Sequence, residues 1–140
     1  MARLTANPEA EASVAFDVLQ PQVAQMRVAA ITEKESKSTP GNKLWEVKLE
    51  FVNPHDVLKQ DGSPAKNPGT LIDSSLVVHP PEKQGKVKGF VLSCGKEWSG
   101  DIDSEDLIGC ECTIKTSVEE YPQGSGDFKT RVSRYIFAKD

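Results

Sequence analysis

The octapeptide LWEVKLEF at residues 44–51 decides the fold class, because apolar and charged side chains alternate strictly from its second residue to its last. Trp45, Val47, Leu49 and Phe51 are apolar, and the three residues between them are charged. A period of two is typical of a strand with one buried and one solvated face. A helix would scatter the three charges around its axis and leave no apolar stripe. Residues 112–118 repeat the alternation, so we predict a mainly β protein.

Four further strands and one helix follow from the rest of the chain. Strands are predicted at residues 22–32, 43–53, 70–78, 110–121 and 128–138. In between, Val87, Phe90, Val91, Cys94 and Trp98 recur at spacings of three and four, which predicts a helix. Short antiparallel strands must protect their edges, and closure into a barrel does so. We therefore predict a five-stranded OB-like barrel with one helix between strands three and four. The alternative is a small β-sandwich or a half-open barrel.

The length of 140 residues suits one domain with its own core. Residues 1–20 lack periodicity and are expected to form a mobile or loosely attached N-terminal arm, with a single domain over residues 21–140. No apolar run approaches the roughly 20 residues of a membrane span. The N-terminus has no basic start followed by an apolar stretch. We expect a cytoplasmic protein, in the host cytoplasm if a phage encodes it.

The cysteines and histidines do not form a recognisable site. Cys110 and Cys112 share one strand face, in a geometry that is poor for a mutual disulfide. His55 and His79 lie far from them in sequence and show no ligand spacing. We therefore expect Cys94, Cys110 and Cys112 to be small buried residues in a reducing compartment, and we predict no metal site and no cofactor.

Enzymatic motifs are also missing from the sequence. Neither histidine lies in a local motif with an acid or a nucleophile, and no phosphate-binding loop is present. The acidic residues at 101–106 lack the glycine and terminal glutamate of a calcium loop. We predict a protein without catalytic residues; an enzyme whose site is assembled from scattered residues is the weakest alternative.

The formal net charge of −4 excludes a chain that is basic overall, so an anionic partner would have to meet a local basic patch. The last strand can supply one. If Phe128, Val132 and Ile136 face the core, then Lys129, Arg131, Ser133 and Tyr135 share the outer face, with Lys115 beside them across the hairpin. Cations neutralise phosphates, and an aromatic ring stacks on a base for about 1–3 kcal/mol.

Two loops extend this predicted nucleic-acid surface, because loops between strands one and two and between strands four and five flank the binding surface of an OB-fold. Arg134 would join the surface if a bulge turned it outward. Nine residues are predicted to bind nucleic acid: Lys34, Lys37, Lys43, Lys115, Tyr121, Lys129, Arg131, Arg134 and Tyr135. The simpler interpretation is that these cations are only solvated, since charges on the second strand alternate in sign at Glu46, Lys48 and Glu50.

Several segments resemble a known family. They are DLIG at 106–109, CECTIKTSVEEY at 110–121, KTRVSRY at 129–135 and GNKLWEV at 41–47. Together they resemble small phage and prophage proteins of the OB-fold single-stranded-DNA-binding type, over about two-thirds of the chain. The resemblance implies sequence-tolerant binding of single-stranded DNA in phage replication or recombination, often as a homo-oligomer. Binding of RNA stays open.

One departure from that family concerns the C-terminus. Replicative single-strand binders commonly carry an acidic tail, whereas this sequence stops at residues 137–140, just after the last predicted strand. This departure argues against partner recruitment through such a tail, for which the acidic N-terminal arm could substitute. The alternative function is a protein–protein interaction module, such as a phage accessory or virion component, which the acidic balance and the Pro-rich residues 54–69 fit equally well.

Overall fold

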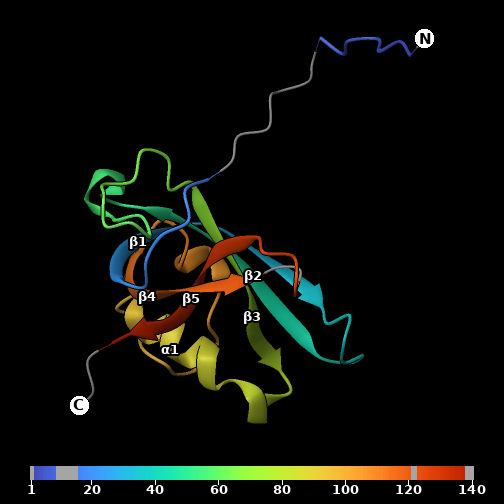
Figure 1. Cartoon of the computed structure of the whole chain (residues 1–140). Coiled ribbons are helices and arrows are strands. Elements are labelled where there is room, and N and C mark those ends of the chain that lie inside the picture. Colours follow the sequence, from blue (N-terminus) through green and yellow to red (C-terminus); the bar gives the residue numbers. More distant parts are fainter. Residues whose placement is uncertain (1, 9–15, 121–122, 138–140) are drawn as a thin grey trace.

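The computed structural model describes residues 2–8, 16–120 and 123–137. Residues 16–120 and 123–137 fold around one antiparallel sheet (Figure 1). The five strands are β1 (Val23–Glu35), β2 (Lys43–Phe51), β3 (Thr70–His79), β4 (Glu111–Glu120) and β5 (Phe128–Ile136). Helix α1 (Gly85–Ser93) lies between β3 and β4, as predicted. Short 3₁₀ turns occupy Pro54–Asp56, Pro81–Lys83 and Ser104–Asp106. Within the described ranges, no helix is long and apolar enough to cross a bilayer.

The strands are ordered β3-β2-β1-β4-β5, which makes β3 and β5 the two edges of the sheet. No backbone ladder joins these edges in the described part of the chain, so the sheet is not closed into a barrel, and that part of the prediction is wrong. The sheet nevertheless curls until β5 lies against β3 (Figure 1). A groove separates the two edges where hydrogen bonds would otherwise form.

The core lies on the concave side of the sheet and is closed at one end by α1. The alternation in β2 buries Val47, Leu49 and Phe51, as predicted. Helix α1 contributes Val87, Phe90 and Val91 to the same cluster. The helix ends at Ser93, earlier than the predicted stripe, because Gly95 adopts a φ of +80° that terminates it. Trp98 therefore lies on the loop that follows the helix, and not on it.

A bulge in β5 reverses the orientation of its last residues. Lys115 pairs with Arg134, whereas the next residue, Thr116, pairs with Val132, so Ser133 is the extra residue. Beyond the bulge Tyr135 points inward and is only 6% exposed, while Arg134 is exposed. The prediction that Tyr135 lies on the outer face is wrong for this reason. Phe128, expected to face the core, is 49% exposed at the start of β5.

Residues 16–20 pack on the domain, although they fall within the predicted arm. Leu19 is fully buried, and its N–H donates to Thr130 Oγ1 at 2.9 Å. Asp17 Oδ2 accepts the N–H groups of Lys66 and Asn67, each at 2.8 Å. These bonds fix the segment beside β5 and the loop before β3.

None of the three cysteines forms a disulfide bond. Cys94 and Cys112 are buried, as predicted, whereas Cys110 is half-buried. The Cys110 thiol lies 3.5 Å from the carbonyl oxygen of Asp106.

Candidate nucleic-acid interface

The outer face of the β4–β5 hairpin carries a row of four cations. The register pairs Lys115 with Arg134 and Ser117 with Arg131, and paired residues share a face of the sheet. Lys129, two residues before Arg131, lies on that face as well. All four cations are exposed. We refer to Lys115, Lys129, Arg131 and Arg134 as the basic row.

One carboxylate lies within the basic row. Glu119 pairs with Lys129 across the strands, and its Oε2 is 3.5 Å from Arg131 Nη1. The pair is largely exposed, with Arg131 and Glu119 side chains 48% and 35% accessible, and such pairs contribute only about 0–1 kcal/mol. A phosphate group could therefore displace the Glu119 carboxylate from Arg131 at little cost in free energy. Four cations and Glu119 make the basic row locally positive on an acidic chain, and Glu111 lies farther along the same face of β4.

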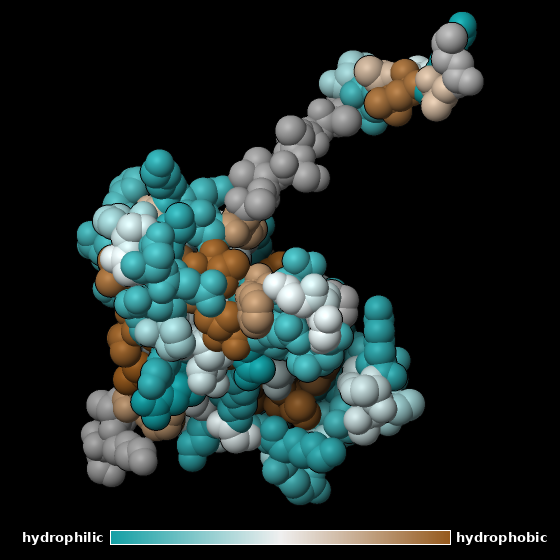
Figure 2. All heavy atoms as spheres, viewed as in Figure 1, coloured by the Kyte–Doolittle hydropathy of each residue, from teal (hydrophilic) through white to brown (hydrophobic). Residues whose placement is uncertain are grey.

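Beside the row lies the β3–β5 groove, a depression of about 670 Å³ between the two sheet edges. Lys129 and Arg131 line its rim. Phe16, Ile72 and Phe128 line it too and are 53%, 59% and 49% exposed. Figure 2 shows apolar atoms exposed in the middle of the face that carries β5. Large apolar side chains gathered in one exposed depression are typical of binding surfaces.

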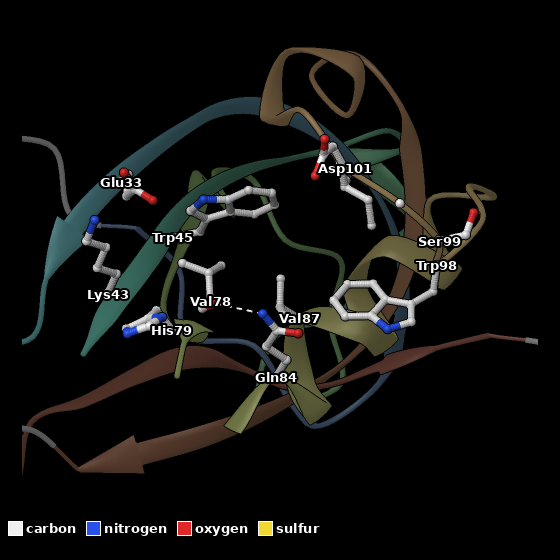
Figure 3. Close-up of a pocket in the computed structure, with 12 residues that line it drawn as sticks. Glu33, Lys43, Trp45, Val78, His79, Gln84, Val87, Trp98, Ser99 and Asp101 are labelled. Atoms are coloured by element: carbon white, nitrogen blue, oxygen red, sulfur yellow. Dashed lines mark hydrogen bonds between the residues drawn. The ribbon is translucent and has the colours of Figure 1, made fainter. Parts of the chain in front are cut away.

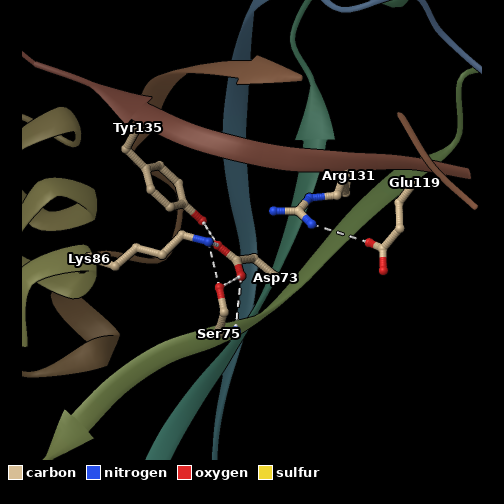
Figure 4. A network of polar contacts seen from close by, with 6 residues as sticks. All are labelled: Asp73, Ser75, Lys86, Glu119, Arg131 and Tyr135. Atoms are coloured by element: carbon tan, nitrogen blue, oxygen red, sulfur yellow. Dashed lines mark hydrogen bonds and ion pairs between the residues drawn. The ribbon is translucent and has the colours of Figure 1, made fainter. Parts of the chain in front are cut away.

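A polar network centred on the buried Asp73 ties the two edges together in the wall of this groove (Figure 4). The Tyr135 hydroxyl donates to Asp73 Oδ2 at 2.7 Å, and the Ser75 N–H donates to Asp73 Oδ1 at 3.0 Å. Lys86 Nζ lies 3.5 Å from Asp73 Oδ2. Burial and the Asp73 carboxylate raise the pKa of Tyr135 well above its ordinary value. The Tyr135 ring is therefore a structural element and is not available to stack on a base.

Asp73 is a buried polar position beside the candidate site that the sequence analysis missed. It is only 6% exposed and lies on the same face of β3 as the buried Leu71. The sequence does place Asp73 at a position that the alternation of β3 turns toward the core. This could have drawn attention to it, because a buried carboxylate needs specific partners. Ser75 is a local partner on β3, but Tyr135 and Lys86 come from β5 and α1, which no local pattern reveals.

The remaining predicted residues do not join the basic row. Lys34, Lys37 and Lys43 belong to the β1–β2 hairpin or its loop. Lys34 Nζ bonds Glu46 Oε1 at 3.0 Å, and this bond, followed by one from Ser74, lowers the pKa of Glu46. Tyr121 lies outside the described residues.

No family model and no curated protein matches this chain. The functional assignment therefore depends on the geometry of the basic row and the β3–β5 groove.

Proposed function

We propose that the protein binds single-stranded DNA, without catalysis and with little sequence preference, along the basic row. The observation that carries this proposal is that four cations from two strands share one exposed face, on which Glu119 and, toward β1, Glu111 are the carboxylates of β4. A strand lying along β5 would place its phosphates over these cations. Each neutralised phosphate releases counterions, which drives such binding.

Stacking would come from Phe128, not from Tyr135. Phe128 is the first residue of β5 and is 49% exposed in the β3–β5 groove, whose rim carries Lys129 and Arg131. A base turned into the groove would stack on this ring for about 1–3 kcal/mol, and the neighbouring cations would hold its flanking phosphates.

The topology supports the same proposal. The order β3-β2-β1-β4-β5, with α1 between β3 and β4, corresponds to an OB-like barrel opened between β3 and β5. With the sequence resemblance, it favours a phage single-strand binder that acts in replication or recombination in the host cytoplasm. Self-association into a homo-oligomer, and binding of RNA, belong to the same proposal.

The test is a charge reversal with a matched control. Labelled oligo-dT is titrated with the wild-type chain, with Lys129→Glu/Arg131→Glu, and with Lys48→Glu/Lys88→Glu, whose lysines are exposed on β2 and α1. Both double variants change the net charge equally, so only a localised site separates them. We expect the first pair to abolish binding at an almost unchanged melting temperature and the second to retain it. Equal effects of the two pairs would refute the proposed face.

A protein partner is the second candidate, and the charge of the groove favours it. Lys86, Lys129 and Arg131 line the β3–β5 groove together with Asp17, Asp73 and Glu119, so cations and carboxylates balance there. A neutral groove with three exposed apolar side chains suits a polypeptide better than a phosphate chain. Weak dependence of binding on salt would favour this candidate.

A further inference from the structure

A second depression lies at the C-terminal end of β3, whereas the β3–β5 groove lies along the N-terminal half of that strand. This tryptophan cleft has a volume of about 560 Å³ and is lined by Trp45 from β2 and Trp98 from the loop after α1 (Figure 3). Val78, Val87 and Ile102 supply further apolar lining. The chain has two tryptophans, so both of them line this one cleft. Its size and apolar walls are those of a small-ligand site.

The polar lining of the cleft comprises Glu33, Lys43, His79, Gln84, Ser99 and Asp101. Gln84 Nε2 donates to the carbonyl oxygen of Val78 at 2.7 Å, which fixes the amide and leaves its oxygen as an acceptor. Asp101 and Glu33 add two carboxylates, against which Lys43 is the one lysine of the lining. In Figure 3, Lys43 lies at the Glu33 end of the cleft, whereas Asp101 lies on the side of Trp98.

We propose that the tryptophan cleft binds an organic cation, an alkylguanidinium or alkylammonium group. The faces of tryptophan rings attract cations more strongly than those of other aromatic residues. Asp101, three residues from Trp98, supplies the counter-charge, and the Gln84 oxygen accepts an N–H from the ligand. A phosphate would meet two carboxylates here, so the cleft does not extend the basic row. The cation could be a free amine or the side chain of a partner protein.

Tryptophan fluorescence of the full chain reports directly on this site, since both indoles line the cleft. The probes are butylguanidinium and its neutral isostere butylurea. We expect butylguanidinium to quench the fluorescence saturably. Butylurea should bind about tenfold more weakly, because it lacks the positive charge that the tryptophan faces attract. Asp101→Asn should weaken butylguanidinium about fivefold, whereas Asp106→Asn, the same change at an exposed acid outside the cleft, should not.

Three results would each overturn the proposal: no saturable response, equal binding of the urea, or no difference between the two Asn variants. A tripeptide Gly-Arg-Gly with blocked ends, compared with its citrulline counterpart, identifies the source. Tighter binding of the arginine peptide than of butylguanidinium indicates a protein side chain, and weaker binding indicates a free amine. The Lys129→Glu/Arg131→Glu variant should retain the full response, so failure of the nucleic-acid proposal leaves this one standing.

Discussion

The hydrogen bond between Tyr135 and Asp73 joins the two open edges of the sheet, and Tyr135→Phe removes it without creating a cavity. The phenylalanine ring can keep the packing of Tyr135 against Phe90, whose centroid lies 5.1 Å away at an interplanar angle of 63°. Asp73 loses a donor 2.7 Å from its Oδ2 and retains Ser75 and Lys86. A hydrogen bond to a charged group contributes about 1.5–3 kcal/mol, so we expect a loss of about 2 kcal/mol in the free energy of unfolding.

Urea unfolding followed by tryptophan fluorescence measures this loss, and a second background shows its origin. With Asp73→Ala already in place, the Tyr135 hydroxyl has lost its acceptor. Tyr135→Phe should then cost nothing or stabilise the protein, because it removes a buried unsatisfied group. An equal cost in both backgrounds, or a loss below about 0.5 kcal/mol in the wild-type background, would refute the role assigned to this bond.

The same pair predicts how stability changes with pH. The folded pKa of Tyr135 is raised above its unfolded value of about 10, so the stability linked to its protonated form is fully present below pH 10. Above pH 10 the unfolded chain loses this proton while the folded protein keeps it. The stability difference between wild type and Tyr135→Phe should therefore be about 1.4 kcal/mol smaller at pH 11 than at pH 8. A difference independent of pH would contradict the assignment.

Two further predictions concern a glycine and the cysteines. Gly69 has a φ of +70°, and an added Cβ would lie 2.3 Å from the Phe16 ring, so Gly69→Ala should displace that ring from the groove. Gly62 has a φ of +85° and open space around it, so only its backbone angle is unfavourable for alanine. Gly69→Ala should therefore reduce the free energy of unfolding more than Gly62→Ala. Each alanine should lose about 1 kcal/mol in urea unfolding for its backbone, with an additional loss only at Gly69; equal losses would contradict the contact. A hydrogen bond to the neighbouring thiol on β4, together with burial, raises the pKa of Cys94, so the half-buried Cys110 should be labelled first by a thiol reagent at pH 8. Mass spectrometry locates the label, and modification of Cys94 first would contradict this environment.

The sequence predicts the strands well because their alternation is local. Residues 44–51 place Val47, Leu49 and Phe51 in the core without any knowledge of the rest of the chain. The end of α1 was missed because Trp98 fits the helical spacing, whereas the break is made by Gly95 in a left-handed conformation. The tryptophan cleft follows from that break and could not be predicted.

The outer face of the β4–β5 hairpin was predicted in part, and the error at Tyr135 has one cause. Lys115, Lys129 and Arg131 share the outer face as predicted, since simple alternation holds up to Val132. The bulge at Ser133 then exchanges Tyr135 for Arg134. The only local sign is that strict alternation would have buried Arg134. Closure of the sheet could not be predicted, because it depends on how β3 and β5 meet across the molecule.

The salt dependence of oligo-dT binding tests the central claim most directly. For single strands the slope of log K against log salt concentration is about −0.7 per neutralised phosphate, so the four cations of the basic row predict about −2.8. Lys115→Gln/Arg134→Gln removes two cations at exposed positions and should reduce the slope to about −1.4. A slope near zero, or an unchanged slope in the double variant, would contradict binding along the basic row.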